Sequence, residues 1–359
     1  MHFLLHGATN WNSTNFGDFL YAYEIYHYLK RDATNQVGFY NPSDYFIKYL
    51  DEDVPALDNV GFQEADYLIY IPGGYFGEGH NARFRDTLIQ YIRFMPFGLK
   101  AVRLKKKLLT IGVGAGPIDR WFMKSAIKKI CKNSIAVTTR DIESQKALQD
   151  IGVNNIPEYS DMMLAYNLKR IAKDTEQIQR IKSFVGESKL LLVHYNHSLE
   201  ALEKFAAVIK SFADEHKNYK VVVSADSILP YENDYFNKFS ALCGSEVYHF
   251  IYDNPFEMLK LIEISDSILT CKLHVGVVGC MFDKAVVCVA EHPEKTIRFY
   301  NLIESPQNCM SLYDSTVDKI NEKLNCLCEI PLSIPKTETE KAMKHWQTMQ
   351  RILEKNYEK

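Results

Sequence analysis

The sequence lacks an apolar run of the roughly 20 residues that a membrane-spanning helix needs. It also lacks a strong charge of either sign: the net charge of its 359 residues is -3, which gives no general attraction to nucleic acid. The first residues, Met1 to Gly7, contain no cationic leader and are typical of a strand rather than a signal peptide. We therefore expect a cytoplasmic protein with no nucleic-acid partner.

The cysteines are few and form no pattern of a metal site. Cys271, Cys280 and Cys288 lie in apolar runs, as buried thiols do. Cys326 and Cys328 are separated by one residue rather than the two usual in a zinc hook, and no second pair matches them. We expect free thiols, no metal and no cofactor.

The nucleotide-binding motifs are missing as well. Four glycines fall within residues 73–79, directly after an apolar run, but neither the full G-x-G-x-x-G motif nor a P-loop is present. A tight turn and a ligand-binding loop explain Gly73 and Gly74 equally well. Residues 111–117 have the same form, and we expect Gly114 and Gly116 to allow close contact across a cleft.

Short apolar runs alternate with amphipathic helical stretches along the chain. The runs are rich in Val, Ile and Leu, as are strands of a parallel sheet that is covered on both faces. The expected strands are residues 3–6, 67–71, 108–113, 135–139, 190–194, 220–224, 247–251, 267–270 and 285–290. Helices are expected at residues 141–151, 198–216 and 254–264, among others. The alternation predicts an α/β fold with right-handed crossovers.

The length suggests two domains, and a polar stretch at residues 169–188 separates two series of strands. We expect an N-terminal Rossmann-like domain at residues 1–165 and a C-terminal Rossmann-like domain at residues 166–335, facing each other across a cleft. Pro335 precedes a final helical pattern. Residues 336–359 are therefore expected to form a C-terminal helix, which could pack back on the N-terminal domain.

The most informative segment is residues 270–276, where a strand is expected to end and a helix to begin. Lys272 and His274 place a cation and an imidazole at this junction. The N-terminus of a helix offers free N–H groups and a positive dipole end, and ligands of open α/β sheets bind at the carboxyl ends of the strands. The segment therefore predicts an anion site.

Other candidate residues stand at similar junctions. Arg140 ends an expected strand, where a carboxylate or phosphate ligand and a structural salt bridge are equally good explanations. Asp18 follows Asn15 and Gly17 at the first strand-to-helix turn, and a simple helix cap is the alternative to a role in the site. Asp161 could face the cleft or cap a turn.

In their order over residues 1–305, these segments resemble the polysaccharide pyruvyl transferase family. The matching elements are N-x-G-D at residues 15–18, Gly-Gly at 73–74, Gly-Pro at 116–117, R-D-x-x-S at 140–144, L-x-x-x-G-V at 148–153, Asp161, basic-Leu-His at 272–274 and Lys295. The resemblance implies a fold like that of GT-B glycosyltransferases. It also implies transfer of a pyruvyl group from phosphoenolpyruvate to two hydroxyls of an acceptor sugar, giving a cyclic ketal and phosphate.

The resemblance further implies roles for single residues. Arg140, Lys272, Leu273 and His274 would form the phosphoenolpyruvate site. The remaining residues expected to bind substrate are Asn15, Gly17, Gly73, Gly74, Gly114, Gly116, Asp161 and Lys295. The chain departs from the family pattern at Lys272, where the family usually has arginine, and at Val275, where it has a small residue.

As a mechanistic hypothesis, Arg140 and Lys272 bind the carboxylate and phosphate of the donor. His274 then acts as the general acid, since the pKa of an imidazole lies near working pH. Asp18 is the expected base for an acceptor hydroxyl. Two other classes stay open: a GT-B glycosyltransferase that uses a nucleotide sugar, and a non-catalytic sugar-binding relative.

A lipid-linked acceptor and peripheral contact with the inner face of the membrane are also open. Residues 103–107 are basic, and residues 120–132 alternate apolar and basic side chains, as a segment on an anionic membrane does. An ordinary helix that covers a sheet with solvated lysines is the favoured interpretation.

Overall fold

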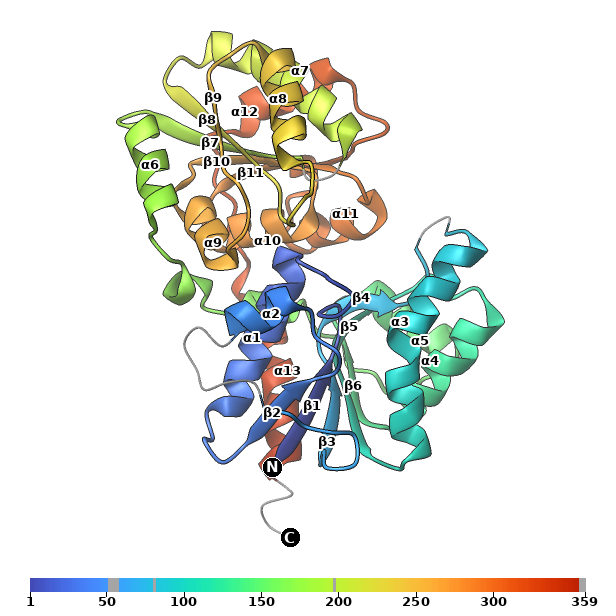
Figure 1. Ribbon diagram of the computed structural model, residues 1–359. Coiled ribbons are helices and arrows are strands. Elements are labelled where there is room, and N and C mark those ends of the chain that lie inside the picture. Colours follow the sequence, from blue (N-terminus) through green and yellow to red (C-terminus); the bar gives the residue numbers. More distant parts are fainter. Residues whose placement is uncertain (51–57, 80–81, 196–197, 355–359) are drawn as a thin grey trace. The chain divides into compact units, whose positions relative to one another are not determined.

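The computed structural model describes residues 1–50, 58–79, 82–195 and 198–354 (Figure 1). The chain divides into two compact α/β units. Unit 1 comprises Met1–Thr14, Asp18–Tyr166 and the chain from Lys336 onward, so the C-terminal helix α13 (Lys336–Glu354) belongs to it. Unit 2 comprises Asn15–Gly17 and Asn167–Pro335.

Unit 1 is built on a parallel sheet in the order β2-β1-β3-β5-β4, with β6 also paired to β5. Its strands are β1 (His2–His6), β2 (Gln36–Phe39), β3 (Tyr67–Tyr70), β4 (Gly73–Phe76), β5 (Lys107–Ala115) and β6 (Ser134–Thr139). Its helices are α1 (Phe16–Lys30), α2 (Asp44–Leu50), α3 (Phe84–Arg103), α4 (Trp121–Asn133), α5 (Ile142–Asp150), the 3-10 helix η1 (Met162–Ala165) and α13. Strand β3 is buried at every position, because helices cover the sheet.

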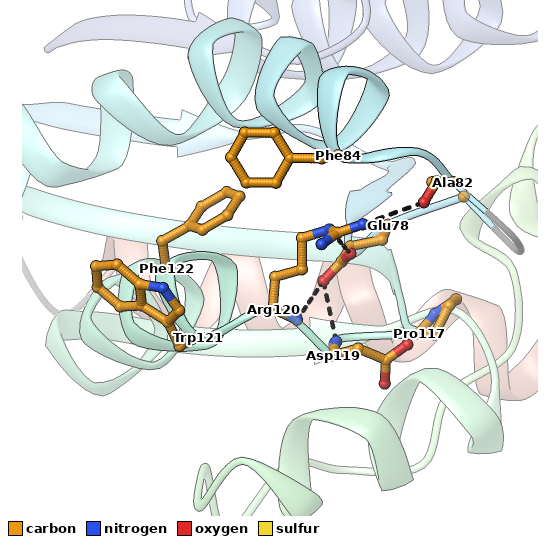
Figure 2. A pocket seen from close by; sticks show the side chains of 9 residues that line it. Glu78, Ala82, Phe84, Pro117, Asp119, Arg120, Trp121 and Phe122 are labelled. Atoms are coloured by element: carbon orange, nitrogen blue, oxygen red, sulfur yellow. Dashed lines mark hydrogen bonds and ion pairs between the residues drawn. The ribbon is translucent and has the colours of Figure 1, made fainter.

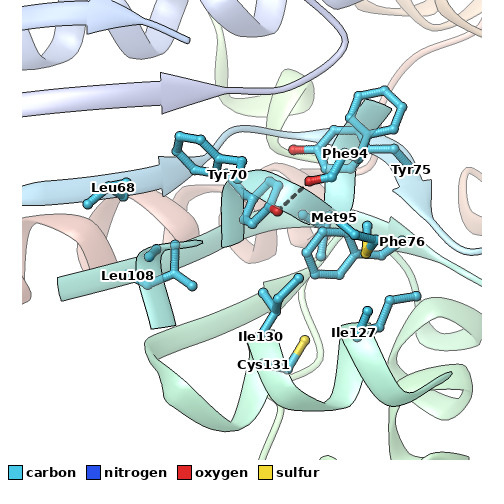
Figure 3. Packing of buried hydrophobic residues seen from close by; sticks show 14 of the residues in the cluster. Leu68, Tyr70, Tyr75, Phe76, Phe94, Met95, Leu108, Ile127, Ile130 and Cys131 are labelled. Carbon is cyan, nitrogen blue, oxygen red and sulfur yellow. Dashed lines mark hydrogen bonds between the residues drawn. The ribbon is translucent and has the colours of Figure 1, made fainter. Parts of the chain in front are cut away.

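One core of unit 1 lies between the sheet and the helices α3 and α4. It contains Tyr70 of β3, Phe94 of α3 and Ile130 of α4 (Figure 3). The hydroxyl of Tyr70 donates to the carbonyl of Phe94 at 2.6 Å and accepts from the N–H of Gly98 at 2.8 Å. A Cβ at Gly98 would lie 2.7 Å from that hydroxyl, so glycine lets α3 approach the sheet closely here. The two helices therefore cover the same face.

Unit 2 has its own parallel sheet, in the order β12-β11-β10-β7-β8-β9. Its strands are β7 (Lys189–His194), β8 (Tyr219–Ser224), β9 (Val247–His249), β10 (Ser267–Thr270), β11 (Ala285–Ala290) and β12 (Cys309–Ser311). Its helices are the 3-10 helix η2 (Leu168–Ile171), α6 (Glu176–Val185), α7 (Leu199–Glu215), α8 (Glu232–Cys243), α9 (Pro255–Ile264), α10 (Leu273–Met281), α11 (Pro293–Leu302), the 3-10 helix η3 (Pro306–Asn308) and α12 (Val317–Leu327). The carboxyl ends of β7, β8 and β10 lie side by side, which places the residues after them at one edge of the sheet.

The predicted α/β fold with two parallel sheets and a C-terminal helix is confirmed. Local caps explain several helix starts: Asp141 accepts from the N–H of Ser144 at 2.6 Å before α5, and Asn254 accepts from the N–H of Phe256 at 2.9 Å before α9. The expectation of a loop at residues 73–74 is wrong, since both glycines lie in β4, which pairs with β5. Gly114 likewise lies inside β5 rather than after it.

Candidate functional site

The junction of β10 and α10 in unit 2 has the predicted form. The strand ends at Thr270, Lys272 is the cap residue, and α10 begins at Leu273. The backbone N–H of Lys272 donates to the hydroxyl of Thr270 at 3.1 Å. A lysine side chain carries no acceptor, so Lys272 does not cap the first N–H groups of α10, and the start of this helix favours an anion.

Lys272 is a half-buried cation with carboxylate neighbours. Its Nζ atom lies 2.7 Å from Oε2 of Glu291, the residue that follows β11. Burial alone would lower the pKa of Lys272, but the carboxylates of Asp226 and Glu291 outweigh burial and raise it. The amino group is therefore charged at every working pH, as an anion site requires.

A buried chain of polar groups supports this junction from the neighbouring strands. Nδ1 of His194, at the end of β7, lies 3.0 Å from the Thr270 hydroxyl, and its Nε2 lies 3.6 Å from Oδ1 of Asp226, which follows β8. Burial would raise the pKa of Asp226, but His194, Lys272 and His274 outweigh it and lower the pKa. Asp226 therefore stays ionised and balances the charge of Lys272.

The segment Asn15–Gly17 lies against this group. Nδ2 of Asn15 donates to Oδ2 of Asp226 at 3.3 Å, and the N–H of Phe16 donates to the carbonyl of Asp226 at 3.0 Å. A Cβ added to Gly17 would lie 2.7 Å from the Cβ of His274 and closer still to its ring. Glycine is therefore required for the backbone to approach the imidazole, a reason the sequence alone does not reveal.

Arg140 is the centre of a second group, in unit 1. It is buried directly after β6, and its Nε lies 3.6 Å from Oδ2 of Asp141. Burial would lower its pKa, but Tyr21, Asp141 and Asp161 outweigh burial and raise it. The Tyr21 hydroxyl is bonded to Arg140 and lies 2.7 Å from each carboxylate oxygen of Asp161. Arg140 is thus held in place by a tyrosine that the sequence did not single out.

Asp161 has the turn-capping role that was one of its two predicted alternatives. Its carboxylate accepts from the N–H of Met163 at 2.9 Å and so caps η1. Burial raises the pKa of Asp161, while Arg140 and the two hydrogen bonds oppose that shift. Asp161 therefore anchors Tyr21 and, through it, the guanidinium of Arg140.

The candidate glycines of unit 1 are explained by close packing. A Cβ at Gly114 would lie 2.7 Å from Nε of Arg140, and one at Gly74 would lie 3.2 Å from a terminal nitrogen of the same guanidinium. A Cβ at Gly73 would meet the ring of Tyr75, and Gly116 has a φ of +85°, which favours glycine. The glycines at 74 and 114 make room for Arg140, and contact with substrate stays a prediction for all four.

The remaining candidates occupy helices. Asp18 lies in the first turn of α1 and is assigned to unit 1, although Asn15 and Gly17 are assigned to unit 2. Leu273 is the first residue of α10 and is half-buried, and Lys295 is exposed in α11. That Arg140 and the Lys272 group bind one ligand in a shared cleft stays a prediction, as do the roles of Asp18 and Lys295.

Unit 1 also contains a pocket of about 810 Å³ near the start of α3 and α4 (Figure 2). It is lined by Glu78, Gly79, Ala82, Phe84, Pro117, Asp119, Arg120, Trp121 and Phe122. The carboxylate of Glu78 accepts from the N–H groups of Asp119 at 3.0 Å and Arg120 at 2.6 Å, and lies 3.2 Å from Nε of Arg120. Glu78 is therefore structural, and the exposed aromatic side chains of the lining are Phe84 and Trp121.

The described part of the chain presents neither a metal-binding cluster nor a membrane-spanning helix. No group of three or more His, Cys, Asp or Glu side chains among the residues that the structure describes could hold a metal ion. Within the same ranges, no helix combines the length and the apolar character needed to cross a bilayer.

Comparison with solved structures identifies the fold. A Listeria monocytogenes protein assigned to the UDP-N-acetylglucosamine 2-epimerases matches with a TM-score of 0.69 and 10% identity, over 99% of this chain and 96% of that one. The UDP-GlcNAc 2-epimerase from Neisseria meningitidis, solved with UDP-GlcNAc, matches with a TM-score of 0.63 and 12% identity, over 98% and 100%. Anabaena HepE, solved with UDP, matches with a TM-score of 0.54 and 13% identity, over 100% and 99%. These neighbours place both units in the GT-B class of folds.

Sequence comparison identifies the family. No curated protein matches this chain. The family model for polysaccharide pyruvyl transferase, however, matches residues 15–293, which include Arg140, Lys272 and His274. The match covers most of the chain, and it confirms the resemblance on which the expected activity depends. The chain belongs to the polysaccharide pyruvyl transferase family and is a transferase.

Proposed function

We propose that this enzyme transfers the pyruvyl group of phosphoenolpyruvate to two hydroxyls of a sugar in the synthesis of a capsule or exopolysaccharide. The observation that carries the proposal is the β10–α10 junction. There the charged amino group of Lys272, the N–H groups at the start of α10 and the imidazole of His274 lie within three residues. A small polyanion whose carbon is to be protonated requires such a cation, such N–H donors and a general acid.

In the proposed reaction, Lys272 and the start of α10 bind the phosphate of the donor, and Arg140 binds its carboxylate. His274 protonates C3 of the enol, which becomes a methyl group and leaves C2 electron-deficient. One sugar hydroxyl adds to C2, phosphate leaves with the electron pair of the C2–O bond, and the second hydroxyl closes the ketal. Of the two hydroxyl protons, one balances the proton given to C3 and the other leaves with phosphate. Asp18 is the proposed base for the first hydroxyl.

Sugar-dependent release of phosphate from phosphoenolpyruvate tests the proposal. A panel of galactosides and N-acetylmannosaminides would be incubated with the enzyme, and the products would be analysed for the pyruvyl ketal by mass spectrometry. We expect phosphate and ketal in equal amounts with the right sugar, and neither with the His274→Ala variant. Wild-type turnover in a folded His274→Ala variant would contradict the role of His274.

A second candidate is transfer of a sugar from a nucleotide sugar. The observation in its favour is that two of the three solved structures compared above were solved with UDP or UDP-GlcNAc. In that case Lys272 and Glu291 would contact the phosphates and the ribose. Calorimetric titration separates the candidates: binding of UDP without binding of phosphoenolpyruvate favours the glycosyltransferase. Sugar binding without any turnover would indicate a non-catalytic relative.

We further place the reaction in the cytoplasm, at the inner face of the membrane, with a lipid-linked sugar as the acceptor. Phosphoenolpyruvate is a cytosolic metabolite, and a polysaccharide unit that must later be exported is suitably carried on a lipid. Turnover of a lipid-linked sugar in detergent micelles, at a lower KM than that of the free sugar, would support this acceptor. Equal KM values would contradict it.

A further inference from the structure

The outer surface of α3 and α4 in unit 1, here named the α3–α4 face, exposes large apolar side chains. They are Phe84, Leu88, Ile89, Ile92 and Trp121, with exposed fractions of 58, 39, 42, 53 and 80%, respectively. Residues 88, 89 and 92 are three and four positions apart and share one side of α3. The opposite side of the helix is buried in the core through Phe94 and Ala101. The apolar side chains of this face are therefore not part of the core of unit 1.

The two helices form one continuous surface. They contact each other. The ring centroid of Phe122, at the start of α4, lies 6.0 Å from that of Phe84 and 5.4 Å from that of Tyr91, both on α3. Trp121 lies beside Phe122, with ring centroids 6.0 Å apart, at the rim of the pocket in Figure 2. The exposed rings of Phe84 and Trp121 thus meet the apolar side of α3 at one end.

The charge of this face is mainly positive. Helix α4 has no acidic residue, and its buried side is Met123, Ala126, Ile127, Ile130 and Cys131. Its lysines at positions 124, 128, 129 and 132 follow the same outer side as Trp121. On α3 the one acidic residue, Asp86, accepts from the N–H of Arg83 at 3.2 Å. The face therefore combines apolar side chains with a row of cations and suits an apolar, anionic surface.

We propose that the α3–α4 face binds the surface of an anionic phospholipid bilayer. Tryptophan and phenylalanine bind at the boundary of headgroups and acyl chains, and lysines near an anionic leaflet each add to the affinity. A sugar would use only the pocket rim, whereas the apolar side chains continue along α3. A second copy of the chain carries the same lysines, so the charge of this face does not favour it as the partner. The proposal concerns where the protein lies in the cell and does not depend on the reaction that it catalyses.

Co-sedimentation with vesicles tests the proposal. The full chain should bind vesicles of phosphatidylcholine with phosphatidylglycerol, and should bind pure phosphatidylcholine far more weakly. Replacing Lys124, Lys128 and Lys129 by glutamate should lower the affinity by at least about a hundredfold, since each lysine is worth about fivefold. Ile92→Ser and Trp121→Ser should each lower it by about tenfold. Added salt should weaken binding of the wild type.

Matched variants elsewhere in unit 1 are the controls. Ile135→Ser removes a side chain that is 51% exposed, close to the 53% of Ile92, from β6. Replacing the exposed lysines at positions 146, 336 and 344 by glutamate changes the net charge as much as the α4 triple variant does. All variants should keep the circular dichroism spectrum of the wild type, and the control variants should bind like the wild type.

Three outcomes would overturn the proposal. One is equal binding of both vesicle types by the wild type. Another is an equal loss of affinity in the control and the α3–α4 face variants. The third is a dimer in light scattering that Ile92→Ser converts to a monomer while no vesicle binding is seen, which would assign this face to a second copy of the chain.

Discussion

The amino group of Lys272 lies 2.7 Å from a carboxylate oxygen of Glu291, so the cation at the start of α10 already has an anionic partner. A bound donor anion must share or displace that partner. Glu291 therefore limits affinity for the donor, while it also holds the lysine side chain in position.

Replacing Glu291 by glutamine should strengthen donor binding. The substitution removes a negative charge beside the anion site but keeps the size of the side chain. Since both groups of the pair are partly exposed, we expect a gain of only about threefold in affinity for phosphoenolpyruvate, measured by calorimetry. Glu329→Gln, which removes the partner of Lys189 in an exposed pair of the same unit, should change nothing. Weaker donor binding in Glu291→Gln would mean that the carboxylate positions Lys272 more than it competes with the donor.

Gly17→Ala should inactivate the enzyme. The new Cβ would meet the side chain of His274 at distances that real Cβ atoms do not show, so the backbone or the imidazole must move. Misplacement of a catalytic group by about 1 Å costs about a hundredfold in rate, and we expect at least that loss in kcat. Gly61→Ala is the control, because there a Cβ has its nearest neighbour at 3.5 Å. Full activity in Gly17→Ala would show that the position of His274 is not critical.

Tyr21→Phe should destabilise unit 1 and weaken donor binding together. Without the hydroxyl, buried Asp161 loses a hydrogen bond and Arg140 loses one of the contacts that hold its guanidinium. We expect a loss of about 1–3 kcal/mol in the free energy of unfolding, measured with urea. Tyr91→Phe, a half-buried tyrosine of the same unit, should cost far less. Unchanged stability in Tyr21→Phe would contradict the hydrogen-bonded connection from Asp161 through Tyr21 to Arg140.

Stability should fall as the pH drops from 6.5 to 4. Burial lowers the pKa of His345 in α13 to about 4, and its ring nitrogens lie 2.8 Å from the hydroxyl of Thr138 and the carbonyl of Ser160. Between pH 6.5 and 4 the unfolded chain binds a proton on His345, whereas the folded chain does not. The stability of the fold is therefore fully retained above pH 6.5 and falls as the pH drops toward 4.

The expected loss from this histidine is about 3 kcal/mol over that range. His6 in β1 acts in the same direction, since burial lowers its pKa to about 3. Urea unfolding at several pH values should therefore show a smaller pH dependence in His345→Gln than in the wild type. Identical pH profiles would contradict the buried, neutral state of His345.

Much of the fold was predictable because buried parallel strands are continuous apolar runs. All nine predicted strands are present, whereas β2, β4 and β12 were missed. These three are only three or four residues long, and β4 begins with two glycines, which local rules assign to a turn. Only pairing with β5, a contact distant in sequence, makes residues 73–76 a strand.

The candidate site was predictable only where position within an element decides it. Lys272 and His274 stand at a strand-to-helix junction, which hydrophobic patterning locates. Tyr21 could not be found, because its partner Asp161 lies 140 residues away. His194 and Asp226 could have been found, since one ends β7 and the other follows β8 at the same edge of the sheet. A rule that treats every polar residue at the end of a strand as a candidate would have included His194 and Asp226.

The most direct test of the central claim is to run the reaction of phosphoenolpyruvate with an acceptor sugar in heavy water and to analyse the ketal by nuclear magnetic resonance. If the enzyme protonates C3 of the donor and transfers the pyruvyl group, the methyl group of the ketal will carry one solvent deuterium, and the His274→Ala variant will form no product. A ketal whose methyl group carries no deuterium, or release of phosphate without any ketal, would contradict the account.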